Sequence, residues 1–309
     1  MKLSFSKFIE KIREKQDLTQ QQLVDTLIES DEKLQKLDLT TISRWERGIT
    51  VPKLSKQLLI ARIMGEDVGL LIDPKEQAPK NKQNSFNILK NRTLNPYISN
   101  SEHFECHQYN SLQDQREVCQ LLTRFHHSFL DMNISMESLQ QCRLYLNLYQ
   151  TFSGDFVGHF LYGFLQAETQ PKVLAPEHLI DCPFIDETNT SSQPIDMYVV
   201  SSFSSLSRPR MLNILTILNS VRNNTKIKNL IVNCHSQEAF DLYETAPEHE
   251  ILTKGDETTL RGVKVFGRTY KYVQLKINAE SLLSSKVVSS LVPNTEENIM
   301  SLLGDKTIG

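Results

Sequence analysis

Asp38-Leu39-Thr40-Thr41-Ile42-Ser43-Arg44-Trp45-Glu46-Arg47-Gly48 is the stretch that decides the fold of the first part of this chain. It predicts a short helix, because Asp38 is a good N-cap and Gly48 can take the left-handed conformation that ends a helix. Ile42 and Trp45 are three positions apart and share a face, which we expect to be buried. The polar and basic residues of the stretch then point away from the core, toward solvent or a partner.

The flanking sequence extends this pattern in both directions. Leu18-Thr19-Gln20-Gln21-Gln22-Leu23 precedes the stretch, and Pro52-Lys53-Leu54 with an apolar helix follows it. The motifs L-T-Q-x-x-L, T-I-S-R-W-E-R-G and P-x-L-x-x-x-L-x-x-A stand in the order typical of the Cro/repressor (XRE-type) helix-turn-helix family, which residues 1–72 resemble. The resemblance implies a DNA-binding transcription regulator that recognises a double-stranded operator.

The same resemblance assigns DNA contacts. Thr19 caps the helix that crosses the DNA backbone in that family, and the following helix enters the major groove. Arg44 is suited to read a guanine, since its planar fork can bond two acceptors. Gln20 is equally compatible with an ordinary solvated position, and the spacing of Trp45 from Ile42 indicates a core residue. The contacts implied are those of Gln20, Leu39, Thr40, Thr41, Ser43, Arg44 and Arg47.

One segment departs from the family pattern. The spacing between Leu23 and Ile42 is longer than usual, and the extra residues fall within 28–37. Leu34 and Leu37 can anchor a lengthened helix or an additional turn of helix while the charged residues stay in water. The insertion is either a solvated excursion or a contact for DNA or a partner.

Length and charge set bounds on the remainder. The chain has 309 residues and a formal net charge of −3. A second domain is therefore required, because one small DNA-binding module accounts for only the first part of this length. Acidic residues outnumber basic residues beyond residue 92, which argues against nucleic acid wrapping around the whole molecule.

Cysteine usage and hydropathy indicate the compartment. The five cysteines are odd in number, widely spaced and without a C-x-x-C pair, so we expect neither a disulfide framework nor a metal site. The N-terminus lacks the uninterrupted apolar core of a signal peptide, and no apolar run reaches membrane-spanning length. These features predict a cytoplasmic protein without a membrane partner.

A polar, lysine-containing segment divides the chain. Residues 73–97 hold three prolines and several Lys, Asn and Gln residues, which is typical of a linker. The predicted organisation is thus a helix-turn-helix domain at residues 1–72, a linker at 73–97 and a second domain at 98–309.

Hydrophobic periodicity in the second domain predicts alternating strands and helices. The expected order is a strand near 104–109, helices at 112–130 and 136–146, strands at 148–152, 156–165 and 195–203, a helix at 211–222, a strand at 230–233, a helix at 236–244, and strands at 250–253 and 263–277. This order resembles the GNAT-type N-acetyltransferase fold. The predicted fold class is an α-helical helix-turn-helix domain plus an α/β (α+β) GNAT-like domain with a mixed sheet.

The GNAT resemblance also implies possible chemistry. Ala239-Phe240-Asp241-Leu242-Tyr243-Glu244 is similar to the A-x-x-L-Y-E of that family's last helix, where the tyrosine serves as general acid, although Tyr243 also fits the inner face of a helix. The turn that cradles the pyrophosphate of acetyl-CoA in the family lacks glycine here and contains Pro209. Arg208 and Arg210 can bind an anion by their side chains instead, or face solvent or an acidic partner.

Other catalytic combinations are less persuasive in the sequence. His126 and His127 are adjacent and diverge on a helix, and Cys234 and His235 have no spaced carboxylate partner.

The degraded turn argues against a working transferase. We therefore expect a sequence-specific transcription regulator whose GNAT-like domain binds a small effector or partner and forms a homodimer. An N-acetyltransferase tethered to DNA, which uses acetyl-CoA or another acyl thioester, is one alternative. An antitoxin-like or adaptor protein that binds a protein partner is another.

Overall fold

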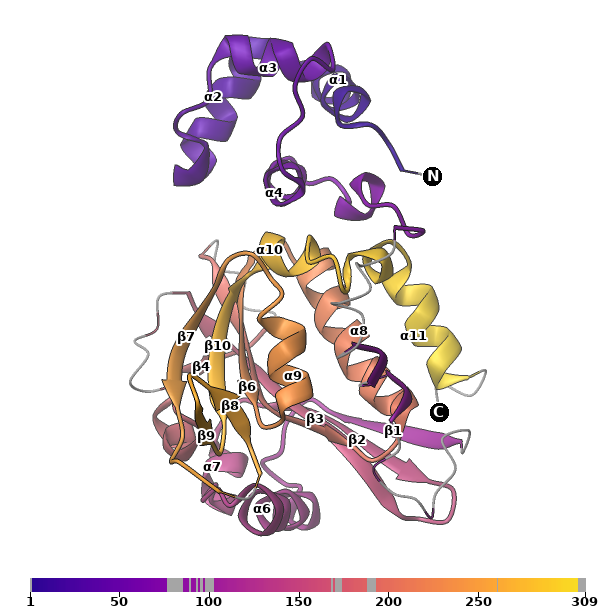
Figure 1. Cartoon of the computed structure of the whole chain (residues 1–309), viewed down its shortest axis with the longest axis vertical. Coiled ribbons are helices and arrows are strands. Elements are labelled where there is room, and N and C mark those ends of the chain that lie inside the picture. The colour runs from indigo at the N-terminus through magenta and orange to yellow at the C-terminus, as the bar shows by residue number, and fades with distance from the viewer. Residues whose placement is uncertain are drawn as a thin grey trace.

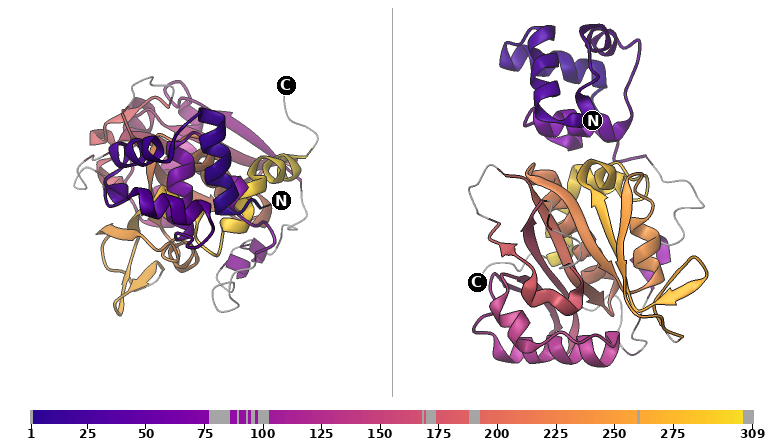
Figure 2. Two further views of the ribbon diagram at one scale, coloured as in Figure 1. Left: turned by 90° about the horizontal axis from the view of Figure 1, so that it is seen from above. Right: turned by 90° about the vertical axis from the view of Figure 1, so that its left-hand side faces the viewer.

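The computed structural model describes residues 2–76, 86–88, 90–92, 94, 97, 103–167, 169, 174–187, 193–259 and 261–304. A helical N-terminal module, residues 5–72, lies against one end of a larger domain built on a mixed sheet, which we call the sheet domain (Figures 1 and 2). Most of the segment expected to be a linker, including residues 77–85, falls outside the described residues.

The second helix of the N-terminal module begins at the expected cap, and the third begins and ends at the expected residues. Thr19 caps the second helix through a capping box with Gln22, and the Asp38 carboxylate accepts a 2.6 Å hydrogen bond from the Thr41 amide. Gly48 has a φ of 66°, the left-handed conformation expected after the third helix. The module consists of α1 (Phe5–Gln16), α2 (Gln20–Ser30), α3 (Leu39–Glu46), α4 (Leu54–Ile63) and the short 3-10 helices η1 (Glu32–Leu34) and η2 (Val68–Leu71).

The insertion between α2 and α3 forms an additional turn of helix. Asp31 caps η1, and Leu34 and Leu37 are buried in the module core while the neighbouring charged residues are exposed. The expected anchoring by these two leucines is therefore confirmed.

Seven strands of the sheet domain follow the order β1-β2-β3-β5-β6-β10-β7, with β4 added to β3. Only β5 and β6 pair in parallel among the strands described, so the sheet is mixed, as expected. The strands are β1 (Phe104–Tyr109), β2 (Tyr145–Thr151), β3 (Phe156–Gln166), β4 (Phe184–Ile185), β5 (Ile195–Ser204), β6 (Ile227–Cys234), β7 (His249–Lys254) and β10 (Val273–Asn278).

Four expected elements of the sheet domain were wrong in extent. The helix expected at 112–130 begins at Arg116, and the helix expected at 211–222 begins at Ser207, so Pro209 lies in its first turn and not in a pyrophosphate-binding turn. The helix expected at 136–146 ends as α7 (Met136–Gln141), because residues from Tyr145 onward pair with β3 as β2. The single strand expected at 263–277 is divided into a hairpin, β8 (Val263–Val265) and β9 (Arg268–Tyr270), and then β10. Phe266 and Gly267 both have positive φ at the tip of this hairpin.

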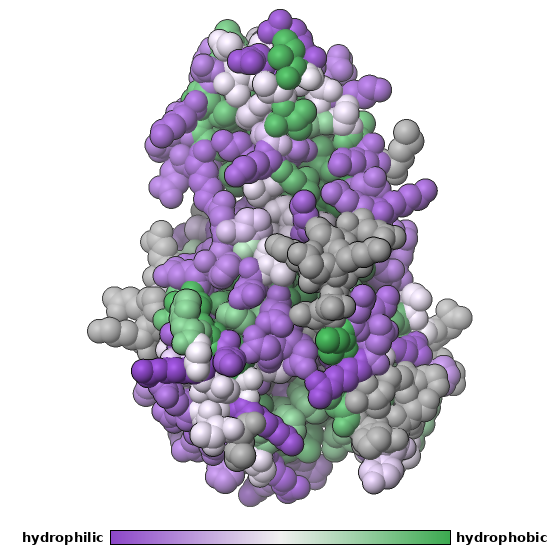
Figure 3. Space-filling model, in the orientation of Figure 1, coloured by the Kyte–Doolittle hydropathy of each residue, from purple (hydrophilic) through white to green (hydrophobic). Residues whose placement is uncertain are grey.

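Helices cover both faces of the sheet (Figure 1). One face packs against α6 (Arg116–Leu130), α7 and the 3-10 helix η4 (Pro176–Asp181). The other face packs against α8 (Ser207–Asn223), α9 (Gln237–Tyr243), α10 (Ala279–Leu283), the 3-10 helix η5 (Ser289–Asn294) and α11 (Thr295–Leu303). The apolar faces of the sheet are thereby buried, and the surface seen in Figure 3 is mostly hydrophilic with separate apolar spots.

No helix among the described residues is both long enough and apolar enough to cross a membrane.

Candidate functional site

A site is formed where the parallel strands β5 and β6 separate. Their pairing runs from Ile195 with Ile227 to Val199 with Val232, and β5 continues to Ser204 beyond the last pair. At the same level the register between β3 and β5 shifts, so that Ser201 pairs with Leu161 and Val200 is left as a bulge. A bulge changes the direction in which the following side chains point, and here it directs the Ser201 hydroxyl toward α6.

Two imidazoles hold the Ser201 hydroxyl. His126 of α6 and His159 of β3 each place Nε2 at 2.9 Å from Ser201 Oγ. All three side chains are buried. We call His126, Ser201 and His159 the Ser201 cluster.

Hydrogen bonding determines which nitrogen of His126 carries the proton. Its Nδ1 lies 2.7 Å from the Leu122 carbonyl oxygen, which can only accept, so Nδ1 donates and Nε2 is left as an acceptor. Ser201 then donates its proton to His126 Nε2, and His159 donates from Nε2 to Ser201 Oγ. The serine is thus paired with a base that a third group orients, an arrangement that favours a nucleophilic serine.

Burial keeps the imidazoles of this region neutral. Desolvation lowers the pKa of His126 to about 4. The hydrogen bond to the Leu122 carbonyl raises this pKa, but by less than desolvation lowers it. The pKa of His159 is lowered well below its usual value by burial, and repulsion by His126 and His235 adds to the effect. Both imidazoles are therefore uncharged at neutral pH, and each has a ring nitrogen without a proton.

A second group of polar side chains continues the site across β6 and β10. Asn233 donates to the Val200 carbonyl and to the Tyr198 hydroxyl, both at 3.0 Å. Gln274, opposite Asn233 in the register, donates to Asn233 Oδ1 at 2.8 Å and to the Leu174 carbonyl at 2.6 Å. The polar groups on this face of the sheet therefore form one connected network beside the Ser201 cluster.

Three buried polar atoms at this network have no hydrogen-bond partner among the described residues: Gln274 Oε1 and both ring nitrogens of His235. Burial lowers the pKa of His235 to about 3, and the nearby Val200 carbonyl opposes this shift without reaching hydrogen-bond geometry. Unsatisfied buried polar groups are rare in folded proteins and often mark a place where a water or ligand binds.

Aromatic side chains separate the Ser201 cluster from solvent. The Phe125 ring lies edge-on to His159 at 4.6 Å and 5.2 Å from the rings of Phe129 and Phe203. Phe129 is partly exposed and lies under the Arg261 guanidinium, 5.6 Å from the ring centre. Access to Ser201 from this side requires these rings to move.

A hollow of about 340 Å³ lies beside the cluster, between α6 and strands β1 and β2. Leu148 of β2 lines this hollow and pairs with His159 of the neighbouring strand β3. The hollow and the cluster are therefore separated by the distance between two adjacent strands. The remaining lining is mixed in polarity: His107, Tyr109, Glu117, Val118, Gln120, Leu121, Arg124, Gln150 and Phe156.

The residues expected to contact DNA lie on the N-terminal module. Leu39, Thr40, Arg44 and Arg47 are exposed on α3 or at its end, and Thr41 and Ser43 are half-buried. Their assignment to DNA contact stays a prediction.

Two side chains of the module form contacts that the sequence did not predict. The Gln20 amide binds the Glu46 carboxylate, which also pairs with Arg13. Arg47 Nε donates to the Ser43 carbonyl at 3.2 Å.

The expected cofactor and catalytic residues lie on the opposite face of the sheet from the Ser201 cluster. Arg208 donates to the Leu302 carbonyl at 2.9 Å, and Arg210 donates to the Arg92 carbonyl at 2.8 Å. Tyr243 is buried in the core beneath α8 and α9, where desolvation raises the pKa of its hydroxyl. The structure does not bring Tyr243 to Ser201.

The Ser201 cluster was missed by sequence reasoning. His126 and His127 were set aside because adjacent helical residues diverge, yet His126 alone reaches Ser201. The residues of the cluster come from three elements far apart in the chain, so spacing could not join them. A polar residue within an apolar strand, such as His159 between Gly158 and Phe160, was the available signal.

Comparisons with known proteins yield few matches. No family model and no curated protein matches the chain. The similar solved structures include TofI in a ternary complex with an inhibitor and MTA (14% identity, TM-score 0.34), the AHL synthase LasI (11%, 0.34) and TofI in an apo form (13%, 0.33). They cover 60%, 60% and 61% of this chain and 96%, 95% and 95% of those chains, respectively.

These findings correct the expected family and function. The expectation of an XRE-type helix-turn-helix protein that acts as a DNA-binding transcription regulator was wrong: no family model supports it, and the similar solved structures are TofI and the AHL synthase LasI instead. With TM-scores of 0.33 and 0.34, this likeness assigns no activity to the present chain. Its function has to follow from its own side chains.

Proposed function

We propose that this protein is an acyl-transfer enzyme in which Ser201 is the nucleophile and His126 the general base. The observation that carries this proposal is the buried Ser201 hydroxyl, bonded at 2.9 Å by an imidazole whose tautomer the Leu122 carbonyl determines. A nucleophile, a base within hydrogen-bond reach and a group that orients the base are the elements of nucleophilic catalysis.

The proposed reaction has two steps. His126 Nε2 takes the proton of Ser201 as Oγ attacks the carbonyl carbon of an acyl thioester, and the thiolate leaves with that proton as a thiol. An amine or water then attacks the acyl-serine, His126 takes a proton from it, and the proton returns to Ser201 Oγ. His159 donates its hydrogen bond to Ser201 Oγ itself, where it can stabilise negative charge that develops on that oxygen.

The arrangement of the sheet domain favours an acyl thioester as the donor. Its elements follow the order strand, two helices, three strands, helix, strand, helix and two strands, with β4 and the β8–β9 hairpin added. This is the order expected for a GNAT-like fold, and that finer assignment is part of the proposal.

Labelling with a fluorophosphonate probe tests this function. The probe forms a covalent bond with activated serines, so mass spectrometry should find the adduct on Ser201 in the native protein and none in Ser201→Ala. Ser205→Ala is the matched control, because Ser205 lies close in sequence but its hydroxyl donates to the Val157 carbonyl, at 3.2 Å, instead of to an imidazole. Release of thiol from acetyl-CoA or longer acyl thioesters should depend on Ser201 in the same way.

Labelling restricted to other serines, together with thiol release that Ser201→Ala leaves unchanged, would contradict the proposal. The homodimer, the small-molecule effector, the cytoplasmic location and the division at residues 72 and 98 stay predictions.

A further inference from the structure

Arg62 of α4 enters the sheet domain at the turn between α8 and β6. Its guanidinium donates to the carbonyl of Val221 near the end of α8, and to the carbonyls of Thr225 and Ile227 at 3.0 and 2.5 Å. Lysine or arginine groups at such carbonyls stabilise a helix C-terminus. The N-terminal module thus supplies the cap of α8.

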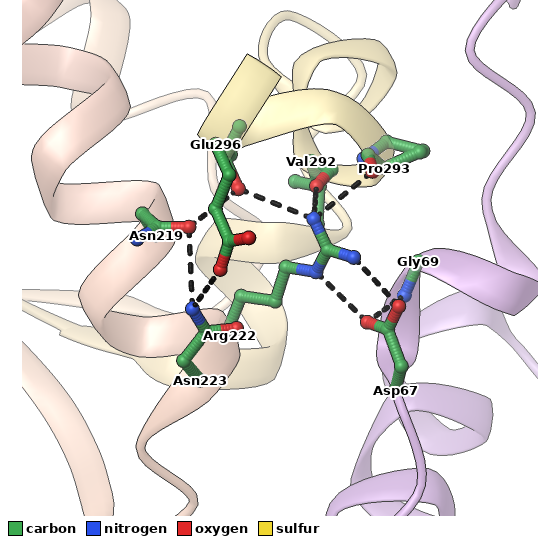
Figure 4. A network of polar contacts seen from close by, with 9 residues as sticks. Asp67, Gly69, Asn219, Arg222, Asn223, Val292, Pro293 and Glu296 are labelled. Atoms are coloured by element: carbon green, nitrogen blue, oxygen red, sulfur yellow. Dashed lines mark hydrogen bonds and ion pairs between the residues drawn. The ribbon is translucent and has the colours of Figure 1, made fainter. Parts of the chain in front are cut away.

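Arg222, in the last turn of α8, makes the second connection (Figure 4). Its Nε and Nη2 bind the two oxygens of Asp67 at 2.8 and 2.6 Å, and Asp67 caps η2 of the module. Its Nη1 donates to the carbonyls of Val292 and Pro293 at 2.8 and 3.0 Å. One guanidinium therefore joins the module, α8 and η5.

Apolar packing continues between the two parts of the protein. The buried side chains of the module and those beneath α8, α9 and α10 form one contiguous cluster rather than two. A hollow of about 660 Å³ remains at the rim of this interface, where Lys33 and Glu248 pair at 2.6 Å. The module is consequently packed against the sheet domain as an integral part of it.

The other end of α8 is bound to the strands that carry the Ser201 cluster. Asn213 of α8 donates to Ser202 Oγ at 2.9 Å and to the His159 carbonyl at 3.3 Å. The Tyr149 hydroxyl donates to Asn213 Oδ1 at 2.5 Å. Ser202 is the neighbour of Ser201 in the chain, and His159 is a member of the Ser201 cluster.

We propose that the N-terminal module is a built-in regulatory element that acts on the Ser201 cluster through α8. The helix is held by Arg62 and Asp67 at its C-terminal end and by Asn213 in its second turn, and a regular helix transmits displacement along its axis. A movement of the module therefore alters the position of α8, and with it the separation of β5 and β6 at the site. This inference concerns the coupling of two regions and does not depend on acyl transfer.

Asp67→Asn tests the coupling with little risk to folding, because Asp67 is partly exposed and asparagine can still cap η2. The variant removes the charge that holds Arg222 to the module. Glu66→Gln is the matched control, since Glu66 is the neighbouring carboxylate but pairs within the module, with Lys15.

The site is read by NMR of the imidazole rings, and the module by the fluorescence of Trp45, the one tryptophan of the chain. In Asp67→Asn we expect the ring signals of His126 and His159 to shift, and the hydrogen exchange of α8 amides to rise on the order of threefold, as the loss of one bidentate ion pair allows. Glu66→Gln should leave the ring signals and the exchange of α8 unchanged.

Arg62→Met provides a second variant that removes the deeper connection. In one contrary outcome, Trp45 fluorescence changes in both Asp67→Asn and Arg62→Met, but the imidazole signals and the hydrogen exchange of α8 stay as in the native protein. The module would then be packed on the sheet domain without acting on the site, and the proposal would be overturned. Equal shifts in the Glu66→Gln control would overturn it as well. Absence of turnover or of Ser201 labelling would bear on the proposed enzyme alone.

Discussion

Arg62 and Glu280 form an ion pair in the interior of the protein, with Arg62 Nε 2.7 Å from Glu280 Oε1 and only 3% and 5% of their side chains exposed. The two residues come from different parts of the chain, α4 and α10. Burial lowers the pKa of Arg62 and the Glu280 carboxylate opposes that shift. The pair is the most deeply buried charge contact between the N-terminal module and the sheet domain among the ion pairs described.

Removal of one partner of this pair should destabilise the protein strongly. Glu280→Gln leaves the Arg62 charge buried without a counter-charge, so we expect unfolding free energy to fall by about 3–5 kcal/mol. Urea unfolding monitored by Trp45 fluorescence measures the loss. Lys33→Met, which breaks the exposed pair with Glu248 at the same interface, should cost less than about 1 kcal/mol. Similar losses in both variants would contradict this account.

The neutral imidazole of His126 should make stability fall in acid. Above pH 6.5 both the folded and the unfolded chain carry His126 uncharged, so its contribution does not vary. Between pH 6.5 and about 4, His126 is protonated in the unfolded chain but not in the folded chain. The free energy of unfolding therefore decreases as the pH falls, by on the order of 3 kcal/mol in total.

Urea titrations across this pH range should reveal that loss. His126→Asn should reduce the slope of unfolding free energy against pH by the contribution of one bound proton. His127→Asn, at the exposed neighbouring position, should leave that slope unchanged. A curve of the same slope in both variants would exclude His126 as the group responsible.

His235 should be replaceable by an apolar residue with a gain in stability. Its two ring nitrogens are buried without hydrogen-bond partners, which costs about 1–3 kcal/mol for an unsatisfied polar group. We expect His235→Leu to raise the urea midpoint at pH 7 and more so at pH 5, where the unfolded histidine is protonated. A lower midpoint for His235→Leu at both pH values would indicate that a bound water or ligand satisfies these nitrogens.

Tyr243→Phe should leave any acyl transfer within about twofold of the native rate. Tyr243 lies in the core beneath α9, on the face of the sheet opposite to the Ser201 cluster, and burial raises the pKa of its hydroxyl. Thiol release measured in parallel for Tyr243→Phe and Ser201→Ala separates the two possible roles. Loss of activity in Tyr243→Phe, with activity retained in Ser201→Ala, would place the chemistry at α9.

Local features of this protein could be read from its sequence. The Thr19 cap, the Asp38 N-cap and the left-handed Gly48 all depend on residues within a few positions, so the start of α2 and both ends of α3 were predicted closely. The alternation of strands and helices in the sheet domain was predicted for the same reason. Where β2 replaced the expected end of a helix, pairing with β3 outweighed the local pattern.

The tertiary structure alone decided the candidate site and the connection between the two parts. The bulge in β5 turns Ser201 toward α6, where it contacts His126 and His159. The spacing of these residues along the chain gives no indication of that bulge. Likewise Arg62 is buried because carbonyls at the end of α8 and the Glu280 carboxylate replace its hydration. The sequence by itself determined contacts between near neighbours, whereas contacts between distant residues depend on how the elements pack.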